Sequence, residues 1–202
     1  MKALQSDFIR EYVEDWPAVV GLAALVMFIL MALLAGVISP QNPYDLSQLY
    51  LENSFKKPLG DFLLGSDSQG RDVLSAILFG LRISIYVAVV STLFSLLVGV
   101  SLGLISGYFG GAVDALIMRC ADIQLSFPAI LVALVIMSLW GQGLTNIILA
   151  ITIVSWVYYA RTARGVVLAE KEKDYALSAK SLGMGRLRIM FSEILPNIMA
   201  PV

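Results

Sequence analysis

The sequence predicts an all-α protein that crosses a membrane several times. Of its 202 residues, 58% are hydrophobic and only 14% are charged, and the mean hydropathy is +0.82. Soluble domains average about 45–50% apolar and about 25% charged residues. The uncharged residues are also gathered into long runs, as membrane-spanning helices require. Together these observations indicate a multi-span membrane protein.

The uncharged runs predict four spans, because a crossing needs roughly 20 apolar residues at a rise of about 1.5 Å each. The expected spans cover residues 18–38, 83–106, 117–139 and 144–162. The last two come from one run that is too long for a single crossing, and the segment WGQG at 140–143 favours a turn between them. Pro128 is expected to bend the third span. The first run is longer than the core of a secretion signal and follows an acidic segment, so we expect it to be a retained span.

The distribution of basic residues predicts the orientation, because Lys and Arg gather on the cytoplasmic side. Half of all basic residues follow closely on the fourth expected span: Arg161, Arg164, Lys171, Lys173, Lys180, Arg186 and Arg188. That segment should therefore be cytoplasmic. With four crossings, the N-terminus shares its side and the 39–82 loop lies outside.

The end of this outer loop carries apolar residues at helical spacing. They are Val73, Leu74, Ile77, Leu78 and Leu81, with Arg71, Asp72 and Ser75 on the other face. We expect a short amphipathic helix at the membrane boundary, which either anchors the next span or helps to shape an outer gate. The chain then divides into residues 1–82, with the N-terminus, first span and outer loop, and residues 83–202, with three spans and a cytoplasmic segment.

Small and charged residues mark two further features of the spans. Gly99, Gly103 and Gly107 lie four residues apart, which predicts a face where another helix packs closely. Arg119 and Asp122 border the third expected span one helical turn apart. They are expected to snorkel or to pair locally, with a role in conduction as the alternative.

The composition leaves little for catalysis. The sequence contains no histidine, and Cys120, its single cysteine, is expected to be a small buried apolar residue. It has no phosphate-binding glycine loop and no pair of carboxylates on one face of a span. A net charge of −1 gives no reason to expect nucleic acid binding. We therefore expect no catalytic residues, no metal site and no cofactor.

The stretch DYALSAKSLGMGRLRIMFSEILPN, residues 174–197, differs from the spans because it is charged and rich in glycine. Its first helix is expected to carry Tyr175, Ala176, Ala179 and Leu182 on one side. Ala176, Ala179 and Gly183 make that side shallow, so that it can sit in a groove of another protein. Gly183 and Gly185 should turn the chain, because glycine readily adopts positive φ. A second helix should carry Leu187, Met190, Phe191 and Ile194 on one face and should end at Leu195-Pro196. Such a pair is either a docking element or an ordinary cytoplasmic loop.

This stretch resembles the cytoplasmic EAA loop of importer-type ABC transporter permeases, whose pattern is Glu-Ala-Ala, three residues, Gly and later Leu-Pro. The matching residues are Ala179, Gly183, Leu195 and Pro196. Leu177 and Ser178 replace the Glu and the first Ala, and Glu193 replaces a usual Ile. Further segments, among them LGSDSQGRDVLSAILFGLRIS and VSWVYYARTARGVVLAEKEKDYALSAKSLG, resemble the C-type subunit of the dipeptide/oligopeptide and nickel permease subfamily.

The resemblance implies a non-catalytic permease subunit of an ATP-driven importer in a bacterial or archaeal inner membrane. Its cargo would be peptides or a related small solute such as a nickel chelate. Its partners would be a homologous permease subunit, two cytoplasmic ATPase subunits and an external solute-binding protein. Family members have six spans, so two more would follow Val202. ATPase coupling falls on Tyr175, Ala176, Ala179, Gly183, Gly185, Leu195 and Pro196.

Two other functions would also suit an apolar chain. A secondary transporter or channel should show ionisable residues or broken helices near the bilayer centre, and the centres of the expected spans carry no charge. An intramembrane enzyme would need the histidine or paired carboxylates that the sequence lacks.

Overall fold

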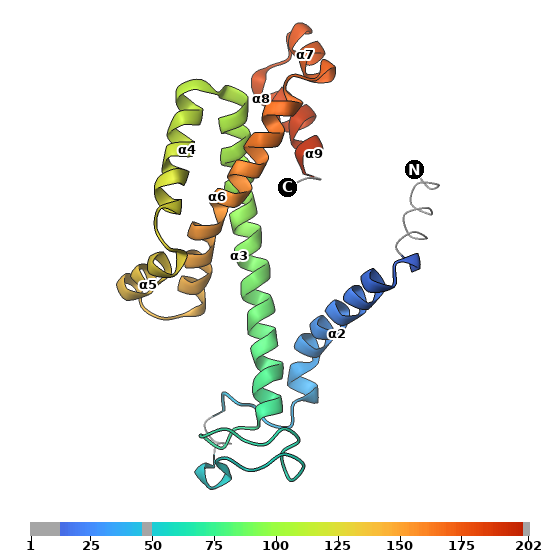
Figure 1. Ribbon diagram of the computed structural model, residues 1–202, viewed down its shortest axis with the longest axis vertical. Helices are drawn as coiled ribbons and strands as arrows, with labels where there is room; N and C mark the ends of the chain where they lie inside the picture. Colours follow the sequence, from blue (N-terminus) through green and yellow to red (C-terminus); the bar gives the residue numbers. More distant parts are fainter. Residues whose placement is uncertain (1–12, 46–49, 200–202) are drawn as a thin grey trace. The chain divides into compact units, whose positions relative to one another are not determined.

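The computed structural model describes residues 13–45 and 50–199, and over these ranges the chain is helical and forms no β-strand. The helices appear in Figure 1 in chain order: α2 (Trp16–Ile38), the 3₁₀ turn η2 (Leu51–Asn53), α3 (Val73–Phe109), α4 (Gly111–Leu125), α5 (Ala129–Trp140), α6 (Leu144–Glu170), α7 (Asp174–Ser181), α8 (Arg186–Arg188), the π-helical η3 (Ile189–Ile194) and α9 (Leu195–Ile198). The all-α class is confirmed. Most of the segment before the first span, expected inside, lies outside the described residues.

Among the described residues, α2, α3 and α6 are each long and apolar enough to cross a membrane. The third expected span is not one helix, because α4 and α5 meet at an angle of 88°. The break falls where sequence analysis placed a bend: Pro128 precedes α5 directly. Proline lacks a backbone N–H and disfavours helical geometry in the residue before it. The pair therefore counts as a fourth span only if it crosses as a bent one.

The turn expected between the last two spans is present. α5 ends at Trp140 and α6 begins at Leu144. The Asn146 side-chain amide donates hydrogen bonds of 2.8 Å to the carbonyl oxygens of Trp140 and Gly141. These bonds satisfy carbonyls that the end of α5 would otherwise leave unpaired.

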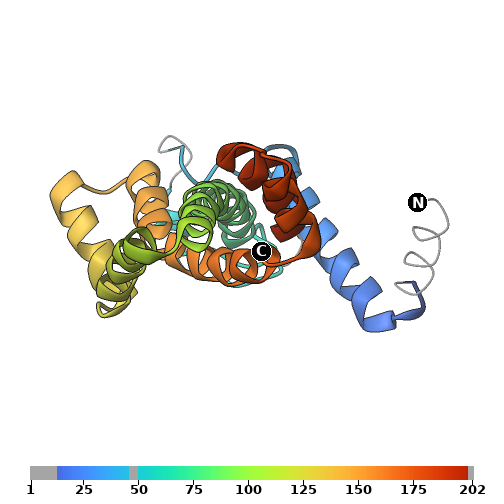
Figure 2. The same ribbon diagram turned by 90° about the horizontal axis from the view of Figure 1, so that it is seen from above.

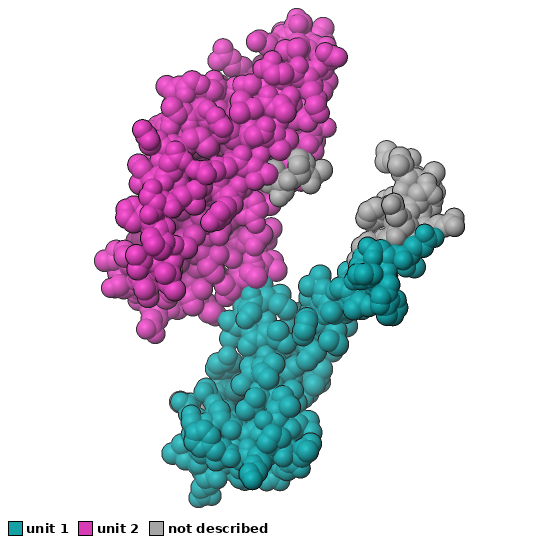
Figure 3. All heavy atoms as spheres, viewed as in Figure 1, with its two compact units in different colours: residues 1–86 teal, residues 87–202 magenta. Residues whose placement is uncertain are grey.

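The chain forms two compact units, residues 1–86 and 87–202, which are coloured separately in Figure 3. The helix expected to begin at 83 begins at Val73 and continues without interruption to Phe109. The separate amphipathic helix was therefore a wrong prediction. Asp72 fixes this start, because its Oδ2 accepts hydrogen bonds from the Ser75 N–H at 2.8 Å and the Ser75 hydroxyl at 2.5 Å. This is the geometry of a helix N-cap.

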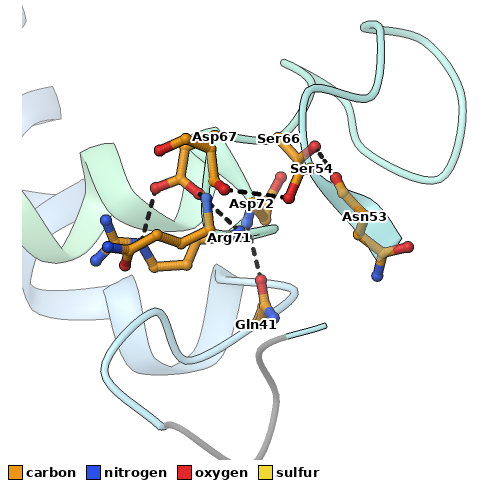
Figure 4. A network of polar contacts seen from close by, with 9 residues as sticks. Gln41, Asn53, Ser54, Ser66, Asp67, Arg71 and Asp72 are labelled. Carbon is orange, nitrogen blue, oxygen red and sulfur yellow. Dashed lines mark hydrogen bonds and ion pairs between the residues drawn. The ribbon is translucent and has the colours of Figure 1, made fainter. Parts of the chain in front are cut away.

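In the first unit, the loop before α3 contains the short turn η2, and polar contacts hold the loop together (Figure 4). The Asp67 carboxylate accepts hydrogen bonds from the backbone of Gln69 and Arg71 at 2.8 and 2.9 Å, and from Arg71 Nε at 2.8 Å. Burial raises the pKa of Asp67, but the bonds from Arg71 and Gln69 together hold that pKa below its ordinary value. Gln41 joins the same region, since its Oε1 accepts the Asp72 N–H at 2.8 Å.

In the second unit, α6 lies beside the part of α3 that belongs to this unit, and both views show the contact (Figures 1 and 2). A cluster of buried side chains joins these helices to the chain end: Val100, Leu104, Ala163, Val167, Ala179, Ile189, Met190, Ile194 and Ile198. α4 packs on α6, but Cys120 of α4, expected to be buried, is exposed.

Candidate functional site

The candidate site is the terminal helix element, residues 174–198, which follows α6 after three residues. Its first helix, α7, buries Ala176 and Ala179 and exposes Leu177, and Leu182 directly after the helix is exposed as well. Ala179 belongs to the buried cluster of the second unit. The small residues that sequence analysis turned toward a partner thus face this chain's own helices. Leu182, expected on the same face, is 82% exposed.

Gly183 forms the corner of the element as predicted. Its φ is +78°, which is the left-handed conformation that glycine adopts without strain. The Gly183 N–H donates to the Lys180 carbonyl at 3.0 Å, and the Met184 N–H donates to the Ala179 carbonyl at 3.1 Å. This pair of bonds is the Schellman motif that closes a helix C-terminus. Gly185 precedes α8 with a φ of −64°, so it needs no special conformation.

The second half of the element buries part of the expected face, since Met190 and Ile194 are buried as predicted. Ile189, Met190, Ile194 and Ile198 are buried, whereas Leu187 and Phe191 are exposed. The expected spacing assumed a regular α-helix, but the turn η3 is π-helical. A π turn holds one more residue than an α turn and shifts every later side chain around the axis.

The helical path does not end at Leu195-Pro196, contrary to expectation. Pro196 lies in the first turn of α9, which continues to Ile198. Proline is tolerated there because its missing N–H is one that a helix start leaves unpaired. The widened turn accommodates it, since the Leu195 N–H donates to the Met190 carbonyl five residues back.

The base of the element is held by Glu170, the last residue of α6. Its carboxylate is buried and accepts hydrogen bonds of 2.7 Å from the Tyr175 hydroxyl and from Lys173 Nζ. Burial, together with the neighbouring Glu170 carboxylate, raises the pKa of Tyr175 to about 12. The Tyr175 hydroxyl therefore stays protonated and remains a donor at neutral pH. Sequence analysis missed Glu170.

The three spaced glycines of α3 lie against α6. A Cβ atom built on Gly99 would stand 2.5 Å from the Trp156 carbonyl oxygen, and one on Gly103 would stand 2.4 Å from the Ala160 carbonyl oxygen. On Gly107 it would stand 2.8 Å from Val167 Cβ. The two backbones are in contact along this line, as small residues permit between membrane helices.

An ion pair joins α6 to α4, and a serine of α3 bonds to the same carboxylate. Arg164 donates to both carboxylate oxygens of Asp114, at 2.5 and 2.6 Å, and the Ser106 hydroxyl donates to the same carboxylate at 2.5 Å. Lys171 Nζ adds a bond of 3.0 Å to the Gly107 carbonyl. Asp114 and Arg164 are fifty residues apart, so no local pattern in the sequence could have paired them.

Further contacts join α4 to α6. Asp122 pairs with Arg161 rather than with its neighbour Arg119. The Trp156 indole N–H donates to Gln124 Oε1 at 2.9 Å, and the Gln124 amide donates to the Ile153 carbonyl. Helix spacing suggested a pair within α4, but the tertiary fold brings Arg161 of α6 to Asp122.

The described residues offer no group of three or more side chains that could hold a metal ion. They form the terminal helix element, which has an exposed apolar tip and is joined to α6 by hydrogen bonds and buried side chains.

Comparison with known proteins covers nearly the whole chain. Residues 99–202 match the family model described as "Binding-protein-dependent transport system inner membrane component", and residues 4–58 match the "N-terminal TM domain of oligopeptide transport permease C". The chain is 40% identical to a dipeptide transport system permease protein of Haemophilus influenzae over 92% of its own length and 64% of the relative.

Two other relatives show how widely the similarity extends. An oligopeptide transport system permease protein of Bacillus subtilis is 38% identical over 99% of this chain and 65% of the relative. A nickel transport system permease protein of Escherichia coli is 31% identical over 85% of this chain and 62% of the relative. The chain thus spans a little under two thirds of the length of these relatives.

Proposed function

Since the chain belongs to the family of binding-protein-dependent transport system inner membrane components, we propose that it acts as a membrane-spanning permease subunit of an ATP-driven importer. The observation that carries this proposal is the terminal helix element within the matched region. The element begins with the short helix α7, which has an exposed apolar tip and follows α6, a helix long enough to cross the membrane. A subunit that converts a partner's motion into reorientation of its own spans needs such an element, and it needs no catalytic residue of its own.

The proposed partners follow from that role. They are a homologous permease subunit, two cytoplasmic ATPase subunits and an external solute-binding protein. The proposed cargo is a peptide or a related small solute, because the similar proteins are named for transport of dipeptides, oligopeptides and nickel. The external protein would set the choice among these solutes.

The mechanism we propose is alternating access. Closure of the ATPase dimer would displace the terminal helix element, and α6 would follow because the element is packed on it. α3 would move with α6, since their backbones touch along the three glycines. Rigid-body motion of packed helices is a common way to transmit such a displacement.

The contact with the ATPase would fall on the exposed side of α7 and its corner. Ala176 and Ala179 are buried in this chain, so they support the helix from inside. Leu177, Leu182 and Leu187 are exposed large apolar residues on either side of Gly183. Exposed leucines beside a tight corner are more favourable when buried in a groove of a partner protein than when exposed to water.

The function can be tested by reconstituting the protein in vesicles with the homologous permease subunit, the ATPase subunits and the binding protein encoded beside it. The expected result is solute uptake that requires ATP and the binding protein. Uptake driven by an ion gradient without ATP would favour a secondary transporter instead.

Topology gives an independent test. In a Cys120→Ser background, Asp61→Cys in the outer loop and Ser178→Cys in α7 should react with a membrane-impermeant thiol reagent from opposite sides. Both positions are exposed in the structure, so access is decided by the membrane alone. Labelling of both from the outside would contradict the proposed orientation.

The docking surface predicts a loss of affinity for one substitution. Leu182→Asp should weaken retention of the ATPase subunits about tenfold or more, because it places a charge in an apolar contact. The measurement is the yield of ATPase that co-purifies with the membrane subunit. Leu51→Asp is the matched control: Leu51 is similarly exposed but lies in the outer loop, and the variant should retain the ATPase fully. Equal retention in both variants would exclude Leu182 from the contact.

A further inference from the structure

The connection between α6 and α7 contains only residues 171–173, and the buried carboxylate of Glu170 forms hydrogen bonds across it. Glu170 ends α6, and Tyr175 lies in the first turn of α7. Glu170 Oε2 accepts the Tyr175 hydroxyl and Oε1 accepts Lys173 Nζ, both at 2.7 Å. The Lys173 N–H also donates to the Glu170 carbonyl at 3.2 Å. Both carboxylate oxygens are therefore used, and both bind groups beyond the end of α6.

These bonds fix the direction in which α7 leaves α6. A buried carboxylate without partners is costly, so the fold favours the one arrangement that satisfies Glu170. A hydrogen bond from a hydroxyl to a carboxylate is stronger than one between neutral groups. Tyr175 remains protonated well above neutral pH, so this bond persists under physiological conditions.

The apolar contacts of α7 do not set its direction in the same way. The buried residues of α7 are Ala176 and Ala179, and their methyl groups make apolar contacts, which are not directional. Leu177 of α7 and Leu182, which follows the helix, are exposed and hold no buried position against α6. The bond between Glu170 and Tyr175 is thus the directional contact between the two helices.

We propose that Glu170 and Tyr175 are positioning residues that lock α7 to the end of α6, so that displacement of α7 by an ATPase moves α6 instead of rotating α7 about residues 171–173. This inference rests on the proposed function. It separates two properties of the terminal helix element: binding of the ATPase, which depends on exposed leucines, and transmission of its motion, which depends on a buried hydrogen bond.

The test removes the bond and leaves the docking surface intact. Tyr175→Phe deletes one hydroxyl, and Glu170→Gln keeps an acceptor oxygen but removes the charge. In reconstituted vesicles, both variants should retain the ATPase and hydrolyse ATP. The amount of solute taken up per ATP should fall about tenfold or more for Tyr175→Phe, as expected for one charge-assisted bond, and less for Glu170→Gln. Combining the two should add little, since they break the same interaction.

Glu172→Gln is the matched control, because Glu172 is two residues away and exposed, and it should keep the uptake per ATP of the unmodified protein. Unchanged uptake per ATP in Tyr175→Phe would overturn the proposal. So would a loss of ATPase retention equal to the loss of uptake, because the bond would then merely stabilise the element. Failure of the unmodified protein to show ATP-dependent uptake is a separate result, which would contradict the proposed function itself.

Discussion

Replacing Gly103 with leucine is expected to separate α3 from α6 and to lower the yield of folded protein severalfold. The first side-chain atom alone would lie 2.4 Å from the Ala160 carbonyl oxygen and 2.8 Å from Ala163 Cβ. Neither atom can move aside without moving the α6 backbone. Overpacking of this kind typically costs about 1–3 kcal/mol, and the absence of a flexible neighbour places Gly103 at the upper end. The measurement is the thermal unfolding midpoint and monodispersity of the purified protein.

Gly80→Leu provides the control for this prediction. Gly80 lies in the same helix, and a Cβ atom there would meet nothing within 4 Å. The two variants carry the same change in helix propensity, so a difference between them reports the α3–α6 contact. An unfolding midpoint for Gly103→Leu equal to that of Gly80→Leu would show that the helices part at little cost.

The second large effect is expected at the ion pair between Asp114 and Arg164. Arg164→Met should lower the free energy of unfolding by about 1.5–3 kcal/mol, the range for hydrogen bonds to charged groups. The variant would leave the Asp114 carboxylate, which is mostly shielded from solvent, with the Ser106 hydroxyl as its remaining close donor. Thermal unfolding in detergent measures this loss directly.

Arg119→Met is the comparison, since Arg119 is exposed on α4 and forms none of the ion pairs found among the described residues. It should unfold like the unmodified protein. Asp114→Asn should cost less than Arg164→Met, because an amide oxygen still accepts from Arg164. If Arg164→Met and Arg119→Met unfold alike, the pair contributes no more than an exposed surface contact.

Both interactions act on α6, which makes this helix the centre of the second unit. α3 touches it through glycines, α4 is tied to it through Asp114 and Asp122, and the terminal helix element is joined to it through Glu170. α6 therefore connects α3, α4 and the terminal helix element within this unit.

Several features of this protein were determined by the sequence alone. Long apolar runs predict spans because a helix in lipid must satisfy its own backbone. Gly183 predicts a corner because only glycine takes positive φ freely. Pro128 predicts a break in the helix because proline has no backbone N–H to donate. The spacing of Gly99, Gly103 and Gly107 indicates a helix contact, although it says nothing of the partner.

The tertiary structure decided the features that depend on residues far apart in the chain. Local spacing assigned Ala176 and Ala179 to a partner's groove, but an amphipathic helix has the same pattern whether its small face meets another protein or its own chain. In the segment that contains the π turn at 189–194, Ile189 and Ile198 join Met190 and Ile194 in the buried face, whereas Phe191 is exposed. Arg164 forms an ion pair with Asp114, and Arg161 forms one with Asp122. These partners lie too far apart in the sequence for a periodic pattern to pair them. A periodic pattern shows which residues share a face of one helix. Which helix packs on that face depends on the tertiary fold.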